Sequence, residues 1–172
     1  MISQLRRLRA SQEGFTLLEL LIVIVIIAIL AAIVFVALDP ARRFKDARDA
    51  RRASDVVELL HAAKIDQVDN GGDYDAAITA LTAGDVYMIG TAVLGCDDDN
   101  VSCDTNVTAD TDCVDLTGLV TSGYLGEVAI SPAGAVTWDA ATTGYTAEVN
   151  ANGTLTIRAC ESENTTEIFS VR

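Results

Sequence analysis

The sequence predicts an α+β protein in which a long N-terminal helix, apolar over its first half, packs against an antiparallel sheet of three or four strands. Three observations support this fold class. Residues 15–38 hold 22 apolar residues in 24 positions, broken only by Thr16 and Glu19. Apolar residues at helical spacing continue to about residue 63. Short alternating segments separated by turn residues follow Pro132.

The apolar segment from Phe15 to Leu38 is long enough to cross a membrane as a helix. At about 1.5 Å per residue it would extend over roughly 36 Å, compared with a hydrocarbon layer of about 30 Å. No polar residue occurs from Leu20 to Leu38, so such a helix must be surrounded by lipid or by other apolar helices. The sequence has no second run of this kind, which excludes a polytopic membrane protein.

An amphipathic continuation of the helix is predicted over residues 39–70. Asp39-Pro40 either interrupts the helix or caps a new one with Pro40 at its first position, and both alternatives give helix from Ala41 onward. Asn70-Gly71-Gly72 is a typical helix end. We expect one face of this segment to pack on the sheet, formed by Ala53, Val56, Val57, Leu60 and Ala63.

Residues 71–172 form a predicted acidic globular head. From Asp66 to Arg172 there are 18 acidic and two basic residues, a charge of −16, while the whole chain carries −13. Such a head repels phosphate, which excludes nucleic-acid binding through bulk charge. The predicted elements are helix at 73–83 and 115–124 and strands at 86–89, 136–138, 145–149, 154–159 and 167–171.

Glu19 is an acidic residue inside the apolar segment, where an ionised carboxylate is costly unless it meets a cation. Before it stand a leader containing Arg6, Arg7 and Arg9 and the sequence Gly14-Phe15-Thr16-Leu17-Leu18. A basic leader ending in glycine, then Phe-Thr-Leu-x-Glu, then a long apolar helix resembles the type IV pilin family, including the pseudopilins of type II secretion systems.

The resemblance implies a pilin-like fold and a class III signal peptide that a prepilin peptidase cleaves between Gly14 and Phe15. It also implies N-methylation of the new Phe15 amine, and a role for Glu19 in neutralising the amino terminus of a neighbouring subunit. The expected parts are therefore a leader (1–14), a transmembrane and filament-core helix (15–38), its amphipathic continuation (39–70) and the head (71–172). A secretory signal peptide does not fit, because the apolar block is too long and no small-x-small cleavage site follows it.

The topology has two conflicting indications. The leader has three arginines before the apolar segment, whereas six basic residues follow it between Arg42 and Arg52. By the positive-inside rule, the side with more basic residues is cytoplasmic, which would place the head in the cytoplasm. The resemblance implies cleavage on the cytoplasmic side, and the cysteines favour an oxidising compartment for the head. We therefore expect a single-pass precursor in the cytoplasmic membrane with the head outside, and a cell-surface filament after assembly.

Four cysteines, all in the head, allow three disulfide pairings. Zinc binding is the weaker alternative, because no Cys-x-x-Cys occurs and the chain has a single histidine. The preferred pairing is Cys96–Cys103, which closes a short loop, with Cys113–Cys160, which ties the long loop to the sheet.

No cofactor is expected, although calcium is a possible ligand of the acidic loop. Asp97, Asp98, Asp99 and Asp104 supply the hard oxygen atoms that calcium prefers. The spacing does not match an EF-hand. A solvated acidic loop is the alternative explanation.

The function that follows from the resemblance is a structural subunit of a type IV pilus-like filament. Its partners would be copies of itself, other pilins, the prepilin peptidase, an assembly platform with its ATPase, and the membrane. The alternatives are a pseudopilin of a secretion or DNA-uptake machine and a monomeric membrane-anchored binding domain. An enzyme is not expected, because His61, the only histidine, lies on a charged helix without an obvious nucleophile.

Overall fold

The computed structural model describes residues 14–172, so Met1 to Glu13 of the predicted leader lie outside the described part. Two helices account for most of its helical structure, α1 (Leu17–Leu38) and α2 (Pro40–Asp69). Asp39 between them has a left-handed backbone (φ 37°), and Pro40 opens α2. This agrees with the alternative in which proline takes the first helical position, where its missing N–H costs nothing. The described residues up to Pro40 form one unit and Ala41–Arg172 a second.

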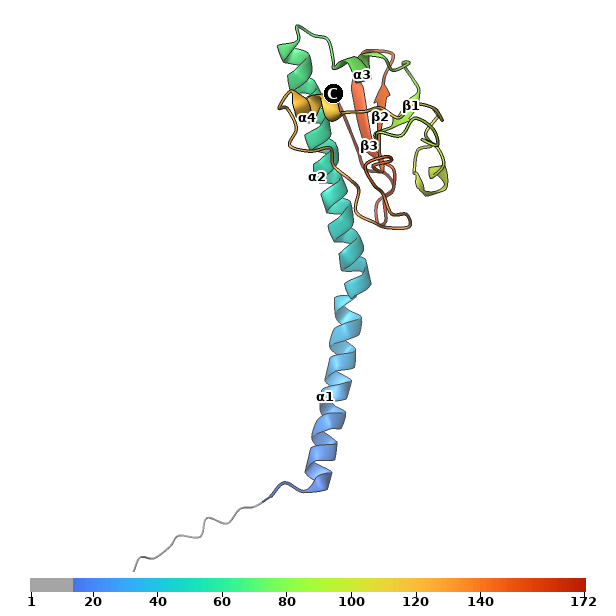
Figure 1. Ribbon diagram of the computed structural model, residues 1–172. Helices are drawn as coiled ribbons and strands as arrows, with labels where there is room; N and C mark the ends of the chain where they lie inside the picture. The colour runs from blue at the N-terminus through green and yellow to red at the C-terminus, as the bar shows by residue number, and fades with distance from the viewer. Residues whose placement is uncertain (1–13) are drawn as a thin grey trace, which may run out of the picture. The chain divides into compact units, whose positions relative to one another are not determined.

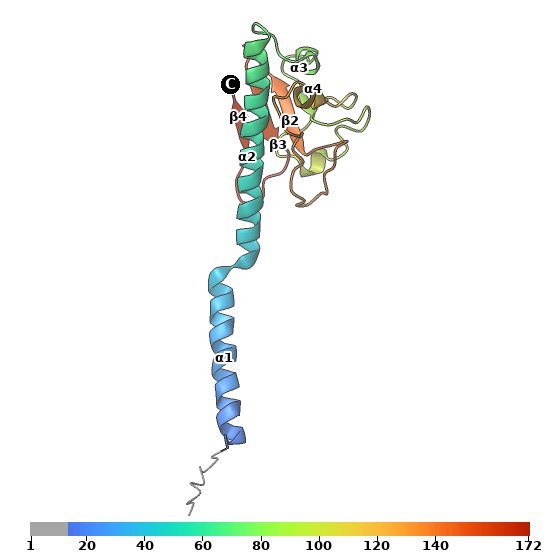
Figure 2. The ribbon, with the colours of Figure 1, turned by 60° about the vertical axis from the view of Figure 1, so that its left-hand side comes forward.

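The second unit is an α+β fold built on one sheet. The strands β1 (Val86–Met88), β2 (Tyr145–Val149), β3 (Leu155–Ala159) and β4 (Phe169–Val171) pair antiparallel in that order. The short elements α3 (Ala76–Thr79), η1 (Asn100–Ser102) and α4 (Thr117–Thr121) lie in the connections. Figures 1 and 2 show α2 running alongside the sheet. The predicted fold class is therefore confirmed, as a pilin-like α+β architecture.

The main core lies between α2 and the sheet. Leu59 and Leu60 of α2 pack with Tyr145 and Ala147 of β2 and Ile157 of β3, all fully buried. On the opposite face of the sheet, Met88 joins a smaller cluster with Trp138 and the cysteines. This second cluster holds the long loop between β1 and α4 against the sheet.

The buried face of α2 differs from the predicted one. Val56, Leu60 and Ala63 are buried as expected, but Ala53 and Val57 are exposed. Their places on the inner face are taken by Leu59, Ala62 and three charged residues, Asp49, Arg52 and Asp66. A search for an apolar stripe could not find this face, because part of it consists of charged residues, and two of these, Asp49 and Arg52, pair with groups that are distant in the sequence.

One predicted strand is absent, and several other elements are shorter than predicted, among them the helices expected over 73–83 and 115–124 and the strand expected over 167–171. Residues 136–138 form no strand, since the Val136 carbonyl accepts the Gly134 N–H at 3.2 Å and the Asp139 N–H donates to the Thr142 carbonyl at 3.1 Å, so the backbone here makes local turns and joins no ladder. The apolar Trp138 side chain is instead buried in the second cluster. The helix expected over 73–83 shrinks to α3, since the Asp75 carboxylate accepts the Ala77 N–H at 2.9 Å and starts the helix late.

All four cysteines form disulfides, but the predicted pairing is wrong. The bonds join Cys96 to Cys113 and Cys103 to Cys160. Backbone hydrogen bonds explain the choice. Cys113 N–H donates to Ala92 and Cys96 N–H to Asp110, which folds this loop onto itself. Asp104 N–H donates to the carbonyl of Cys160, which brings Cys103 beside it. Loop length along the chain therefore did not predict which cysteines meet.

Candidate functional site

The predicted cleavage site lies in extended chain just before α1. Gly14, Phe15 and Thr16 precede the helix, and Phe15 is 81% exposed. A Cβ atom added at Gly14 would meet nothing within 4 Å. Within residues 14–172, the bond between Gly14 and Phe15 is therefore open to a peptidase. Cleavage and methylation there stay predictions.

Glu19 takes part in a capping box that sequence reasoning missed. Its carboxylate accepts the N–H and the hydroxyl of Thr16, both at 2.9 Å, while the Thr16 hydroxyl oxygen accepts the Glu19 N–H at 3.2 Å. The Thr-x-x-Glu spacing before an apolar run was the available signal. In this single chain the Glu19 carboxylate therefore caps the start of α1. Neutralising the amino terminus of a neighbouring subunit, the role that the resemblance implies, would need a second copy.

Within residues 14–172, none of the 22 residues of α1 is buried. At about 1.5 Å per residue it extends over roughly 33 Å, enough to cross the hydrocarbon layer of a bilayer. It lies in the one stretch of the described residues that is long and apolar enough to do so. An apolar surface of this extent needs lipid or other helices around it.

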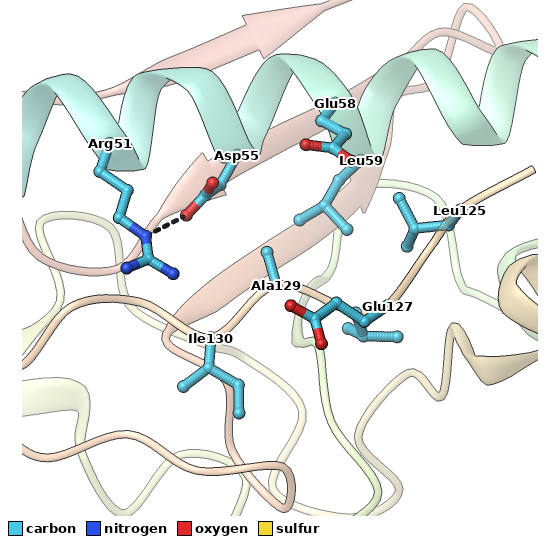
Figure 3. Close-up of a pocket in the computed structure, with 9 residues that line it drawn as sticks. Arg51, Asp55, Glu58, Leu59, Leu125, Glu127, Ala129 and Ile130 are labelled. Atoms are coloured by element: carbon cyan, nitrogen blue, oxygen red, sulfur yellow. Dashed lines mark ion pairs between the residues drawn. The ribbon is translucent and has the colours of Figure 1, made fainter.

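A pocket of about 260 Å³ lies between α2 and residues 125–130 (Figure 3). Its apolar lining includes Leu59 and Ile130, and its polar lining is Arg51, Asp55, Glu58 and Glu127. Asp55 accepts a hydrogen bond from the Tyr145 hydroxyl at 2.6 Å. Desolvation, then this hydrogen bond, raises the pKa of Tyr145 well above its usual value, so the phenol stays protonated.

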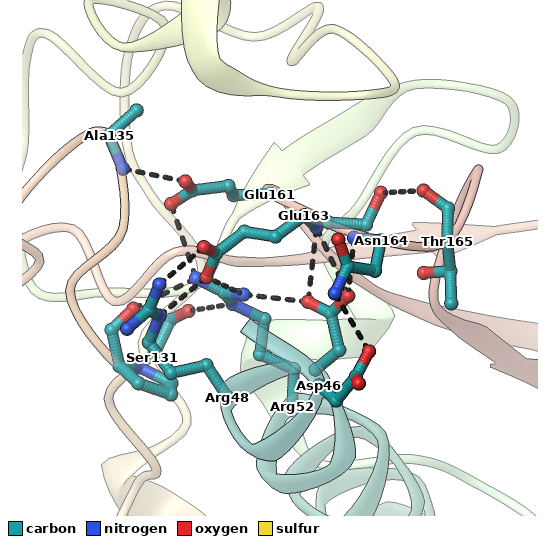
Figure 4. Close-up of polar contacts among 12 residues, drawn as sticks. Asp46, Arg48, Arg52, Ser131, Ala135, Glu161, Glu163, Asn164 and Thr165 are labelled. Atoms are coloured by element: carbon teal, nitrogen blue, oxygen red, sulfur yellow. Dashed lines mark hydrogen bonds and ion pairs between the residues drawn. The ribbon is translucent and has the colours of Figure 1, made fainter. Parts of the chain in front are cut away.

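A second polar site, which we call the Arg52 clamp, surrounds the fully buried Arg52 guanidinium (Figure 4). Arg52 Nη1 donates to Asp49 at 2.8 Å and to Glu163 at 3.0 Å, and Nη2 lies 3.3 Å from Glu161. Nε donates to the Ser131 hydroxyl and Nη2 also to the carbonyl of Pro132. The clamp fastens α2 to two segments more than 75 residues away.

Neighbouring contacts complete the Arg52 clamp. Arg48 Nε donates to Glu163 at 2.6 Å, and Asp49 accepts the backbone N–H groups of Glu163 and Asn164. The hydrogen bond from Arg48, followed by that from Arg52, lowers the pKa of Glu163 to about 2. No signal in the sequence marked Arg52 as buried, because its acidic partners are remote in the chain.

The acidic loop does not gather its predicted calcium ligands. Asp104 accepts a hydrogen bond from the Ser162 hydroxyl, and Asp99 precedes η1. A hydrogen bond with Asp110, together with desolvation, raises the pKa of Asp97. Within residues 14–172, no three carboxylate, thiolate or imidazole groups are arranged to hold a metal ion.

Calcium binding by Asp97, Asp98, Asp99 and Asp104 stays a prediction with a direct test. If calcium binds the folded head and not the unfolded chain, removing it lowers the melting temperature. The measurement is thermal unfolding of the purified protein with calcium and with excess chelator, using magnesium as the control ion. Equal melting temperatures in calcium and in chelator would contradict the prediction.

Comparison with known families agrees with the N-terminal geometry. A family model described as the prokaryotic N-terminal methylation motif matches residues 9–35. Searches of curated proteins and of solved structures gave no match. The matched range covers the end of the basic leader, the Gly14–Phe15 bond, Glu19 and most of α1. The chain therefore carries the N-terminal methylation motif, the class III signal peptide of type IV pilins and pseudopilins, ahead of an α+β fold of pilin-like architecture.

Proposed function

We propose that this chain is a structural subunit of a type IV pilus-like filament, held in the cytoplasmic membrane before assembly by α1 with its head outside. The observation that carries the proposal is the apolar surface of α1, which the described residues 14–172 leave unburied, in a segment that matches a methylation motif. Lipid can cover that surface in the precursor, and the same surface on other copies can cover it in a filament. The prepilin peptidase, other pilins and an assembly platform with its ATPase are the partners this role requires.

The head supports a mechanical role. The Cys96–Cys113 disulfide closes the long loop on itself, and the Cys103–Cys160 disulfide ties that loop to the end of β3. The Arg52 clamp ties two further segments to α2, and together these links suit a domain exposed on the outside of a fibre. Its acidic surface favours solubility and repels other heads at a distance. Attraction between copies must then come from α1 and from particular local contacts.

Mass spectrometry of material sheared from the cell surface tests the proposal. We expect an abundant chain that begins at N-methylated Phe15 and contains all four cysteines as disulfides. A processed chain that stays in the cell envelope and is absent from sheared material would favour the pseudopilin alternative. A chain that keeps residues 1–14 and remains monomeric in the membrane would contradict filament assembly and favour an anchored binding domain.

A further inference from the structure

The pocket beside α2 carries two carboxylates without partners. Asp55 is engaged by the Tyr145 hydroxyl and lies 3.7 Å from Arg51 Nε. Glu58 and Glu127, in contrast, have no hydrogen bond or ion pair with any residue in the 14–172 range. Glu58 projects from α2 and Glu127 from the facing segment (Figure 3). The pocket therefore has one cation and three carboxylates, of which two are unpaired.

The lining of the pocket indicates the chemistry of its ligand. The carboxylates attract a cation, while Leu59 and Ile130 offer apolar surface to the methylene groups that carry it. A lysine or arginine side chain has this combination of an aliphatic stem and a charged end. A bare metal ion would leave the apolar part of the pocket unused.

Most basic residues of the described chain already have partners. The Arg52 clamp occupies Arg48 and Arg52, and Arg42 and Arg43 make interactions within the chain. Others are engaged too: Lys64 with Tyr74 and Gln67, and Arg158 with Glu148 and Glu167.

Two basic residues are then left to consider, Lys45 and Arg172. Arg172 pairs through its backbone with Leu155 and lines a different pocket, together with His61 and Lys64. Lys45, in the second turn of α2, is exposed and has no partner within residues 14–172. The neighbouring Phe44 is 67% exposed and could add apolar contact.

Lys45 cannot fill the pocket of its own chain. It lies 13 residues before Glu58 on the same helix, a separation of about 20 Å along the axis, which is beyond the reach of a lysine side chain. We propose that Lys45 of one copy enters the pocket between Glu58 and Glu127 of a second copy. This inference rests on the proposed function, because it supplies a contact within the filament.

The contact is directional. The cation and the pocket are different surfaces of the same chain, so each copy offers one of each to its neighbours. In such a head-to-tail contact each copy binds a second copy and still offers a free surface to a third. If the rotation that relates one copy to the next does not close a ring, the result is an open helical assembly. It also gives two strongly acidic heads a local attraction that selects one axial offset.

Zero-length carbodiimide cross-linking of sheared filaments tests the contact directly. The reagent activates a carboxylate, the Lys45 amine attacks its carbonyl carbon, and an amide bond forms as the reagent leaves as a urea. The chain has only two lysines, so the assay has little background. We expect a ladder of covalent oligomers and a peptide that joins Lys45 to Glu58 or Glu127.

Two variants serve as matched controls. Lys45→Arg keeps the charge but removes the reactive amine, so filaments should form and the ladder should disappear. Lys64→Arg should keep the ladder. A ladder that survives Lys45→Arg, or Lys45 joined only to carboxylates outside the pocket, would overturn the proposal.

Charge reversal separates this inference from the proposed function. We expect Lys45→Glu to lower the yield of sheared filaments at least tenfold, and a second substitution, Glu127→Lys, to restore much of it. Unchanged fluorescence of Trp138, the only tryptophan, would show that the heads stay folded. Normal filaments from Lys45→Glu would reject the contact and leave the filament function intact. Absence of wild-type filaments would reject the filament function.

Discussion

Glu19→Ala is expected to abolish surface filaments while leaving a processed, folded chain in the membrane. In a filament core the Phe15 amine of one copy would be buried among apolar helices, where an unpaired cation is strongly unfavourable. Removing one partner of a buried ion pair typically costs about 3–5 kcal/mol, which corresponds to at least a hundredfold loss of assembly. The measurement is the amount of chain in sheared material relative to the membrane fraction, with mass spectrometry to confirm that the chain begins at Phe15.

Two further variants separate charge pairing from helix capping. Glu19→Gln keeps an acceptor for the Thr16 N–H and hydroxyl but removes the charge. Thr16→Ala removes the capping hydroxyl but keeps the charge, at a cost of about 1 kcal/mol. If the carboxylate pairs with an amine, Glu19→Gln should fail like Glu19→Ala, and Thr16→Ala should still assemble. The reverse pattern would show that Glu19 acts only as a helix cap.

Arg52→Ala is expected to destabilise the head more than other single substitutions on α2. It would leave Asp49, Glu161 and Glu163 close together without the buried cation that they share. The expected loss is about 3–5 kcal/mol of the free energy of unfolding. Urea unfolding of the full chain in detergent measures it, with the fluorescence of Trp138, which is 5% exposed, as the probe of the head.

Arg51→Ala is a matched control because it removes the same side chain one position away. Arg51 is largely exposed and pairs with Asp55 at 3.7 Å, so its loss should cost less than about 1 kcal/mol. Arg52→Lys should be intermediate, since an ammonium group cannot reproduce the planar fork of the guanidinium. Equal losses from Arg51→Ala and Arg52→Ala would contradict a structural role for the clamp.

The Arg52 clamp also determines how stability should respond to acid. The pKa of Glu163 is about 2 in the folded protein, below its ordinary value of about 4.3. The stabilisation from Glu163 is therefore complete above that ordinary value and is lost as the pH falls toward 2. Arg52→Ala should weaken this dependence, because one of the two cations beside the carboxylate is removed.

The part of the protein that the sequence predicts best is the part with local causes. These local features are the apolar segment with its Glu19, Pro40 at the start of α2, and the glycines after Asp69. Each of them shapes only the few residues next to it in the chain. The same holds for β2 and β3, whose alternating residues flank a short turn. These features needed no knowledge of distant contacts.

By itself, the sequence determined the helix–sheet fold class, the membrane-length helix and the methylation motif around Gly14, Phe15 and Glu19. Only the tertiary structure decided which cysteines pair, that Arg52 of α2 is buried among remote acidic partners, and that Glu58 and Glu127 line the same pocket. The physical reason is separation along the chain. Periodicity and capping act over a few residues, whereas disulfides and buried ion pairs depend on which remote segments the folded backbone brings together.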